Sequence, residues 1–582
     1  MRFTNGLFPF LIINCLSLIS DTTALPRRSK HRKDMPILTL PYGSFRATYE
    51  SNTDISNDFF ANSYIFRNVP YAAPPVGNLR WRKPQPPITK SGIQDGEFGP
   101  HCPQGVVSGF NIIGPGNRYP AGKAINQIFG GVTLPNFREA DEDCLYLDLY
   151  VPGKALMDGE TLPVVVWVFG GAFVVGSKDI YQPFLPWYDG SGLINQSGGD
   201  PNSVTAMGES ASAGSIEHHL IARGGTLNPL FHRAILMSPA FQPMWDRHGS
   251  MEDIYKKFER LAGCEGRGLA CLRRKSSQDL IEANTELLQT HHPGSFALGP
   301  SPDGSYIRQL PALEIALGRF WPIESIITTH TSEESVLFVS GRVRTNDEFI
   351  EFLPGIFPDY TINAGVVDAI TEFYPPVTRS KSSVYRSQSE RIGALIRDSC
   401  IVCNVRFLNE GVGDRNTYNL QYSVFPGWHG MDLFALFFHP KFSGNSWMQL
   451  LAAVFLFPVG LMFSGISKAL QSYYTSYIIT GDPNAQRARW NVPPTVEWQH
   501  PRSVGREHIS NVVNIGNLHI STVTDTEVSL EACDFWREIF AAATALGGYS
   551  PKNEVVFPSL FNVTMDPSRR FGNLSIEKDW QD

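Results

Sequence analysis

The apolar run at residues 163–169 (PVVVWVF) constrains the fold more than any other part of the chain. An uncharged run rich in β-branched and aromatic side chains is typical of a strand buried on both faces of a parallel sheet. Similar short runs, separated by longer helix-like stretches, lie at residues 203–207, 231–237, 322–328 and 417–425. Strands that alternate with helices predict an α/β fold with a mostly parallel central sheet flanked by helices.

The length of 582 residues by itself allows about four domains. Hydrophobic residues make up 42% and charged residues 18%, and no repeat period is present, which excludes coiled-coil and solenoid classes. The net charge of −7 gives no basic surplus, so we expect no nucleic-acid partner. A large, loop-rich globular enzyme fits this profile.

The N-terminus has the pattern of an export signal over residues 1–24, with Arg2, an apolar core at 7–19 and small residues at 22–24. That core is too short for the ~20 residues of a membrane span. Residues 25–39 form a basic leader, whose run 27–33 is either a processing site or, as we favour, a solvated segment. Three glycosylation sequons agree with a secreted, extracellular chain: Asn195, Asn562 and Asn573.

A second apolar segment, at residues 450–463, lies within the stretch 447–466. Pro458 and Gly460 interrupt it, so a buried helix or an apolar cleft wall is favoured over a membrane span.

The cysteines favour disulfides, because their spacing fits no zinc site and the chain carries an export signal. Cys15 lies inside that signal, which leaves seven in the mature chain. Cys264 and Cys271 would close a short loop, and Cys102 with Cys144 would close a long one.

The last three cysteines hold one more pair and one leftover thiol: Cys400, Cys403 and Cys533. Cys403 with Cys533 is the pair that we expect, although the spacing does not decide between the choices.

A candidate nucleophile, Ser210, follows the strand at 203–207 directly and precedes a helix-like stretch at 213–220. Strand, sharp turn and helix are typical of a nucleophile elbow, whose helix N-terminus favours developing negative charge. The elbow pattern G-x-S-x-G is broken here, because Ser212 stands where its last glycine should be. A plain strand-to-helix turn is the alternative interpretation.

Two further features suit a serine nucleophile. Small residues at 170–172 (GGA) end the strand 163–169, and their backbone N–H groups are candidates for an oxyanion hole, unless this is an ordinary glycine-rich turn. Glu334 and His429 come just after the strands 322–328 and 417–425. The resulting order, Ser210, Glu334, His429, is the α/β-hydrolase order of nucleophile, acid and base.

These motifs, and much of the chain between residues 40 and 550, resemble the type-B carboxylesterase/lipase family, in particular its secreted fungal lipases and esterases. The resemblance rests on residues 68–77 with 79–81, 142–147, 199–205, 231–235 and 480–484. It implies one catalytic α/β-hydrolase domain over residues 40–550, followed by a C-terminal tail at 551–582.

The resemblance implies that Ser210 is the nucleophile, Glu334 the acid and His429 the base, with no metal or organic cofactor. Glu333 competes for the acid role, but the small Ser335 and the later Phe338 fit the family spacing after Glu334. The oxyanion hole would be made by three backbone N–H groups: those of Gly171, Ala172 and Ala211.

The same resemblance implies two disulfides, Cys102–Cys144 and Cys264–Cys271. In lipase-like members the first closes a flap over the active site, and residues 110–129 here are apolar enough for one, although a packed surface loop is equally consistent. The implied partner is a small-molecule or lipid ester, with contact to a lipid interface in the lipase case. The sequence does not indicate an oligomeric state.

The chain departs from the family pattern in two places. Ser212 replaces the last elbow glycine, and we expect this small residue to be tolerated with some backbone strain. Only 27 positions separate Ser177 from Val204, where the family has a helix, a strand and a second helix. One crossover fits that length and two do not, so the sheet is expected to lack one central strand and its crossover helix.

Such a gap leaves three outcomes: a sheet that closes up, a weakened fold, or a coding sequence that has lost an exon. We favour the third, since residues on both sides still match the family. The leading functional hypothesis is a secreted serine carboxylic ester hydrolase. The alternative is a catalytically impaired or non-catalytic binding protein on the same fold.

Overall fold

The computed structural model describes residues 35–51, 63–96, 99–105, 140–179, 199–291, 297–339, 343–380, 383–437, 465–487 and 493–548. Several predicted features lie outside these residues: the export signal, residues 25–34 of the leader, the candidate flap, the apolar segment 450–463, the three sequons and the C-terminal tail. Within the described residues, no helix is long and apolar enough to cross a membrane.

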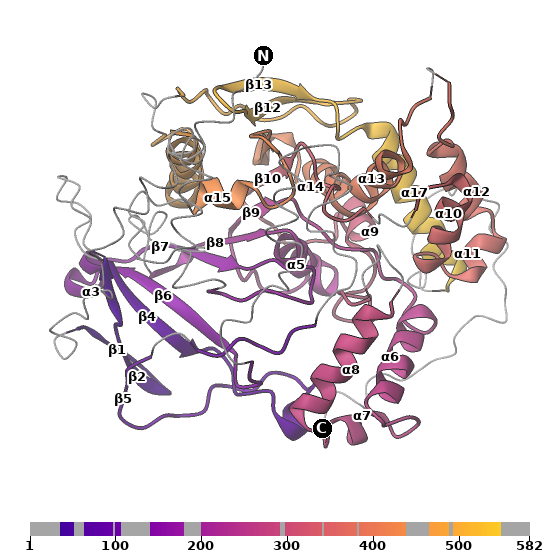
Figure 1. Ribbon diagram of the computed structural model, residues 1–582. Coiled ribbons are helices and arrows are strands. Elements are labelled where there is room, and N and C mark those ends of the chain that lie inside the picture. Colours follow the sequence, from indigo (N-terminus) through magenta and orange to yellow (C-terminus); the bar gives the residue numbers. More distant parts are fainter. Residues whose placement is uncertain are drawn as a thin grey trace, which may run out of the picture.

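The centre of the molecule is a seven-stranded sheet in the order β13-β12-β11-β10-β9-β8-β7 (Figure 1). Its strands are β7 (Leu162–Val168), β8 (Gly199–Glu209), β9 (Arg233–Met237), β10 (Ser325–Thr331), β11 (Thr417–Tyr422), β12 (Ile509–Ile515) and β13 (Ile520–Asp525). All neighbours are parallel except β12 and β13. The predicted α/β-hydrolase fold with a mostly parallel sheet is confirmed.

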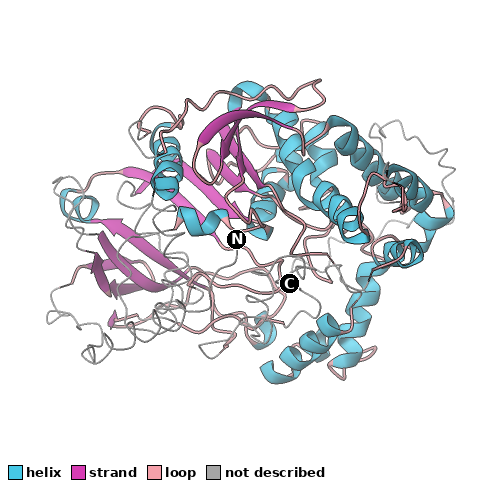
Figure 2. Ribbon diagram, turned by 45° about the horizontal axis from the view of Figure 1, so that its top comes forward, coloured by secondary structure: helices cyan, strands magenta, loops and turns pink. Residues whose placement is uncertain are grey.

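Helices flank the sheet on both sides (Figure 2). The α-helices of the described residues include α3 (Gly153–Asp158), α5 (Ala211–Leu220), α6 (Ser250–Leu261), α7 (Gly268–Leu272), α8 (Ser277–Gln289), α9 (Pro311–Ala316), α10 (Asn346–Phe352), α11 (Asp359–Asn363), α12 (Val366–Phe373), α13 (Gln388–Arg397), α14 (Cys403–Val412), α15 (Asp432–Leu436) and α17 (Leu530–Leu546). A further helix spans residues 465–480.

The alternation of side chains along β9 shows why both faces need cover. Ala234 and Leu236 join a buried cluster with α5 and α14, whereas Ile235 and Met237 join a second cluster with α15 and the helix at 465–480. Successive residues of a strand point to opposite faces, so a strand with apolar side chains on both faces needs a layer of helices on each side. β9 is buried along its whole length.

The prediction that β7 is buried on both faces was wrong. Val166 is 47% exposed and Val168 is 36% exposed. The reason is its position, because within the described residues β7 pairs with β8 alone and forms the edge of the sheet.

The N-terminal strands form two separate small sheets. One has the order β3-β4-β6, with strands Tyr49–Ser51, Ser63–Pro70 and Tyr146–Pro152, and the other has the order β1-β2-β5, with strands Ile37–Leu40, Gly43–Arg46 and Ile93–Gln94. Within the described residues, β6 pairs only with β4, and no strand joins it to β7. The central sheet therefore stops where the sequence predicts a missing strand.

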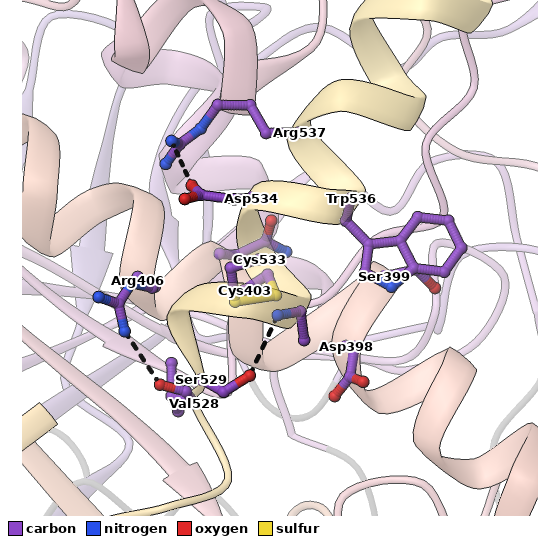
Figure 3. Close-up of a disulfide and its surroundings, with 12 residues drawn as sticks. Asp398, Ser399, Cys403, Arg406, Val528, Ser529, Cys533, Asp534, Trp536 and Arg537 are labelled. Atoms are coloured by element: carbon purple, nitrogen blue, oxygen red, sulfur yellow. Dashed lines mark hydrogen bonds and ion pairs between the residues drawn. A yellow bond between two sulfur atoms is a disulfide. The ribbon is translucent and has the colours of Figure 1, made fainter. Parts of the chain in front are cut away.

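The described residues contain three disulfides: Cys102–Cys144, Cys264–Cys271 and Cys403–Cys533. The second closes a short local loop, whereas the first and third join residues that are 42 and 130 positions apart. The third joins α14 to the first turn of α17, and beside it Arg406 donates to the carbonyl of Val528 at 3.2 Å (Figure 3). In the described part of the chain, Cys400 carries the free thiol.

Candidate active site

Ser210 lies at the junction of β8 and α5, in a turn with φ 62° and ψ −128°. Its N–H donates to the carbonyl of Met237 at 2.9 Å, and its own carbonyl accepts from Gly214 at 3.0 Å. A non-glycine residue in this region costs about 1–3 kcal/mol, and such strain collects at functional sites. The sharp turn is therefore held by hydrogen bonds on both sides of the strained residue.

Glu334 and His429 form a close buried pair. The Nδ1–H of His429 donates to Glu334 Oε2 at 2.5 Å. The other carboxylate oxygen, Oε1, accepts from Ser238 Oγ and from the backbone N–H of Thr331, both at 2.6 Å. These contacts fix the orientation of the carboxylate and, through it, the imidazole.

The neighbouring Glu333 does not share this site. Glu333 is exposed whereas Glu334 is buried, and the backbone N–H of Glu333 donates to the carbonyl of Gly427 at 2.9 Å. That contact aligns the loops that follow β10 and β11. Of the two glutamates, the structure therefore brings Glu334 to His429.

The second ring nitrogen of His429 lies close to another carboxylate. His429 Nε2 lies 3.3 Å from Oε1 of Glu209, the residue just before Ser210. Nε2 makes no hydrogen bond with the described residues, Ser210 Oγ included. Catalytic hydrogen bonds are often long or unaligned until substrate is bound.

The electrostatics of the pair follow from this arrangement. Burial alone would lower the pKa of His429, but the carboxylates of Glu209 and Glu334 outweigh it and raise the pKa to about 9. Burial would raise the pKa of Glu334, but the His429 cation and the hydrogen bonds to the carboxylate lower it. Glu334 is thus held as the anion that an imidazolium needs beside it.

In two other buried acids beside this pair, the pKa is raised, whereas that of Glu334 is lowered. Burial, together with the nearby Glu334 charge, raises the pKa values of both Glu209 and Asp432, while His429 opposes the rise. Like charges so close together in a buried site cannot all ionise freely. His429 therefore carries a charge that depends on how many of these carboxyl groups are ionised.

The turn after β7 approaches Ser210. Gly171, Ala172 and Phe173 all have positive φ values, of 128°, 53° and 61°. A Cβ added to Gly170 would lie 3.2 Å from Ser210 Cβ and 2.6 Å from the carbonyl oxygen of Glu209, so only glycine allows this approach. In the described hydrogen bonds, the N–H groups of Gly171, Ala172 and Ala211 have no acceptor.

A pocket opens beside Ser210, Ala172 and Ala211. The rest of its lining is largely apolar and includes Phe173, Phe241, Leu298, Phe338, Ile396 and Ile401. Cys400 also lines it, and burial raises the pKa of this thiol to about 11, so it stays protonated at neutral pH. In the described part of the chain, no group of three or more His, Cys, Asp or Glu residues is placed to hold a metal ion.

Four polar contacts of the site were not expected from the sequence. Ser238, Glu209 and Asp432 surround the acid–base pair, and Ser212 contacts the backbone of Glu209. Glu209 ends β8 and Ser238 directly follows β9, so their positions at the carboxyl ends of parallel strands were a usable signal. The strain expected at Ser212 is not found, because the positive φ of the elbow belongs to Ser210.

Comparison with known proteins shows the family of the chain. The carboxylesterase family model matches residues 34–196 and 191–536. The two matched segments meet in the connection between β7 and β8, where the sequence predicts that a strand and a helix are missing.

Curated relatives and solved structures are similar along most of the chain. A secreted lipase of Arthroderma benhamiae is 32% identical over 524 residues, covering 81% of this chain and 93% of the relative. Lipase 2 of Geotrichum candidum is 27% identical over 575 residues, covering 83% of this chain and 95% of the relative. The crystal structure of Aspergillus niger EstA superposes with a TM-score of 0.64 at 20% identity and covers 88% of this chain and 99% of that one. The structure of a PNB esterase superposes with a TM-score of 0.61 at 20% identity and covers 86% of this chain and 100% of that one. The chain therefore belongs to the carboxylesterase family and is a carboxylic ester hydrolase.

Proposed function

We propose that this chain hydrolyses apolar carboxylic esters through an acyl-enzyme on Ser210. The observation that carries the proposal is the buried Glu334–His429 pair, whose imidazole Nε2 lies 3.3 Å from Glu209, the residue that precedes the strained Ser210. No single one of these residues is diagnostic. Their meeting at one edge of the sheet is what acyl transfer by a serine needs.

In this mechanism His429 Nε2 takes the proton of Ser210 Oγ as the oxygen attacks the ester carbonyl carbon. Glu334 stabilises the imidazolium that forms. The imidazolium then protonates the leaving alkoxide, which departs as the alcohol. Water, activated by the same Nε2, attacks the acyl-enzyme and releases the carboxylic acid and free Ser210.

The negative charge of the tetrahedral intermediate needs donors that are already in place. We assign this role to the backbone N–H groups of Gly171, Ala172 and Ala211, which lack acceptors in the described hydrogen bonds. Removal of one such donor typically costs about 10²–10³ in kcat. The strained turn after β7 is consistent with a preorganised hole of this kind.

The lining of the pocket supports an ester with an apolar acyl group, since aromatic and aliphatic side chains surround Ser210. Three disulfides and the similarity to a secreted lipase support export from the cell. Both the acyl preference and the secretion are parts of the proposal.

Turnover of a short-chain p-nitrophenyl ester by purified protein tests the proposal, with His429→Ala as the inactive control. We expect measurable hydrolysis by the wild-type chain and loss of it in the variant. A folded wild-type protein without turnover would favour the alternative function, a binding protein on the same fold.

A further inference from the structure

Ser212 stands on the first turn of α5 and makes an unusual pair of contacts. Its Oγ accepts from the backbone N–H of Glu209 at 2.9 Å and donates to the carbonyl of the same residue at 2.7 Å. The residue is 2% exposed. One hydroxyl therefore holds both main-chain polar groups of the residue that precedes the nucleophile.

The residue held in this way touches both other parts of the site. The carbonyl of Glu209 lies against Gly170, at the start of the turn that we assign to the oxyanion hole, and leaves no room for a Cβ there. Its carboxylate oxygen Oε1 lies 3.3 Å from His429 Nε2. A shift of Glu209 would therefore displace the acid–base pair and the oxyanion turn together.

The surrounding sequence accommodates the hydroxyl. A Cβ on Gly208 would lie 2.7 Å from Ser212 Oγ, so the absence of a side chain at 208 makes the space that this oxygen fills. The next serine of the helix, Ser215, contrasts with it, because its Oγ donates to the carbonyl of Ala211 at 2.8 Å within the helix and does not touch Glu209.

We propose that Ser212 is a positioning residue that fixes Glu209 between His429 and the oxyanion turn. This role rests on the proposed function, because it matters only if His429 is the base for Ser210. Ser212 does not touch the reacting atoms and acts through Glu209. The residue that departs from the family pattern is thus an added support of the elbow in this chain.

Two readouts separate positioning from general stability. Without the hydroxyl, the Glu209 amide loses an acceptor, so its hydrogen exchange should accelerate. The charge of His429 depends on the groups that face it, namely Glu209, Glu334 and Asp432. A loosened Glu209 carboxylate stabilises the imidazolium less, which should move the ascending limb of kcat/KM toward lower pH.

The experiment compares Ser212→Ala and Ser212→Gly with Ser215→Ala as the matched control. We expect both Ser212 variants to lose about tenfold in kcat with little change in KM, because small misplacements of catalytic groups are costly. They should also show faster hydrogen exchange at the Glu209 amide and an ascending limb of kcat/KM that lies at lower pH than in the wild type. Ser215→Ala should stay within about twofold of wild type, since no contact of the site depends on it.

The role is overturned if Ser212→Ala matches Ser215→Ala in kcat and pH profile, or if Ser212→Gly is faster than wild type. It is also overturned if exchange at the Glu209 amide is unchanged. Failure of the proposed function differs from these results, because the wild-type chain itself would then be inert towards esters.

Discussion

His429 Nδ1 lies 2.5 Å from Glu334 Oε2, although 95 residues of sequence separate the two. They meet because β10 and β11 are parallel neighbours in register, from Ile326 with Thr417 to Thr331 with Tyr422. The loops that leave the carboxyl ends of these strands are joined by the contact of Glu333 with Gly427. The topology of the sheet therefore brings acid and base together.

The pair makes a direct prediction for the acid. Glu334→Gln keeps the shape of the side chain but removes the charge that stabilises the imidazolium, so kcat should fall by about 10³–10⁴. Steady-state kinetics on a p-nitrophenyl ester measures the loss. Glu333→Gln is the matched control and should stay within about twofold. Equal losses in the two variants would contradict the assignment of Glu334.

The pH dependence follows from the carboxylates around His429. Its pKa is raised to about 9, and the base must be neutral, so kcat/KM should rise with pH with a midpoint above 6.5. Glu209→Gln removes one of the charges that cause the rise and should lower the midpoint. A wild-type midpoint at or below 6.5, or one that Glu209→Gln leaves unchanged, would contradict this account.

A second buried pair concerns stability. His330 Nε2 lies 2.6 Å from Asp525 Oδ2 and joins β10 to the end of β13. His330→Gln leaves the Asp525 carboxylate buried without a cation, so urea unfolding at pH 7 should show a loss of about 3–5 kcal/mol. The exposed pair Arg46–Asp95 provides the control, and Asp95→Asn should cost less than about 1 kcal/mol. Similar losses in both variants would contradict the role of the pair.

The same pair has a defined pH window. Burial alone would lower the pKa of His330, but Asp525 and Glu527 outweigh it and raise the pKa to about 10. The contribution of the His330 charge to the free energy of unfolding is therefore fully present below pH 6.5 and is lost as the pH rises through about 10. Burial would raise the pKa of Asp525, but His330 lowers it, so that contribution is lost in acid. Unfolding free energies of wild type and His330→Gln should therefore converge at both extremes of pH.

The open edge of β7 predicts a longer coding sequence. Within the described residues, β7 does not pair with β6, and Val166 and Val168 are exposed, as expected if a strand between the two is missing. We expect the transcript to carry additional in-frame codons between residues 179 and 199, enough for about a dozen or more residues. The longer chain should melt at a higher temperature. An uninterrupted transcript that encodes these 582 residues would contradict the hypothesis.

Much of this architecture was predictable because local pattern and topology agree. The runs at 163–169, 231–237 and 417–425 correspond to β7, β9 and β11, and alternating strands and helices leave few topologies open. The burial of β7 was not predictable from its own residues, since it depends on a neighbouring strand. The contact of Glu209 with His429 depends on side-chain rotamers, which the spacing of residues does not determine.

Ser212 shows the same limit within the elbow. Its type and position suggested a strained substitute for glycine, whereas the structure places its hydroxyl on both main-chain groups of Glu209. A hydrogen bond of this kind depends on the exact path of a three-residue turn.

The most direct test of the central claim is labelling with a fluorophosphonate, followed by mapping of the modified residue by mass spectrometry. The account predicts one phosphonate per chain on Ser210 Oγ and no labelling of a folded Ser210→Ala variant. Labelling that survives Ser210→Ala, or a folded wild-type chain that takes up no label, would contradict it.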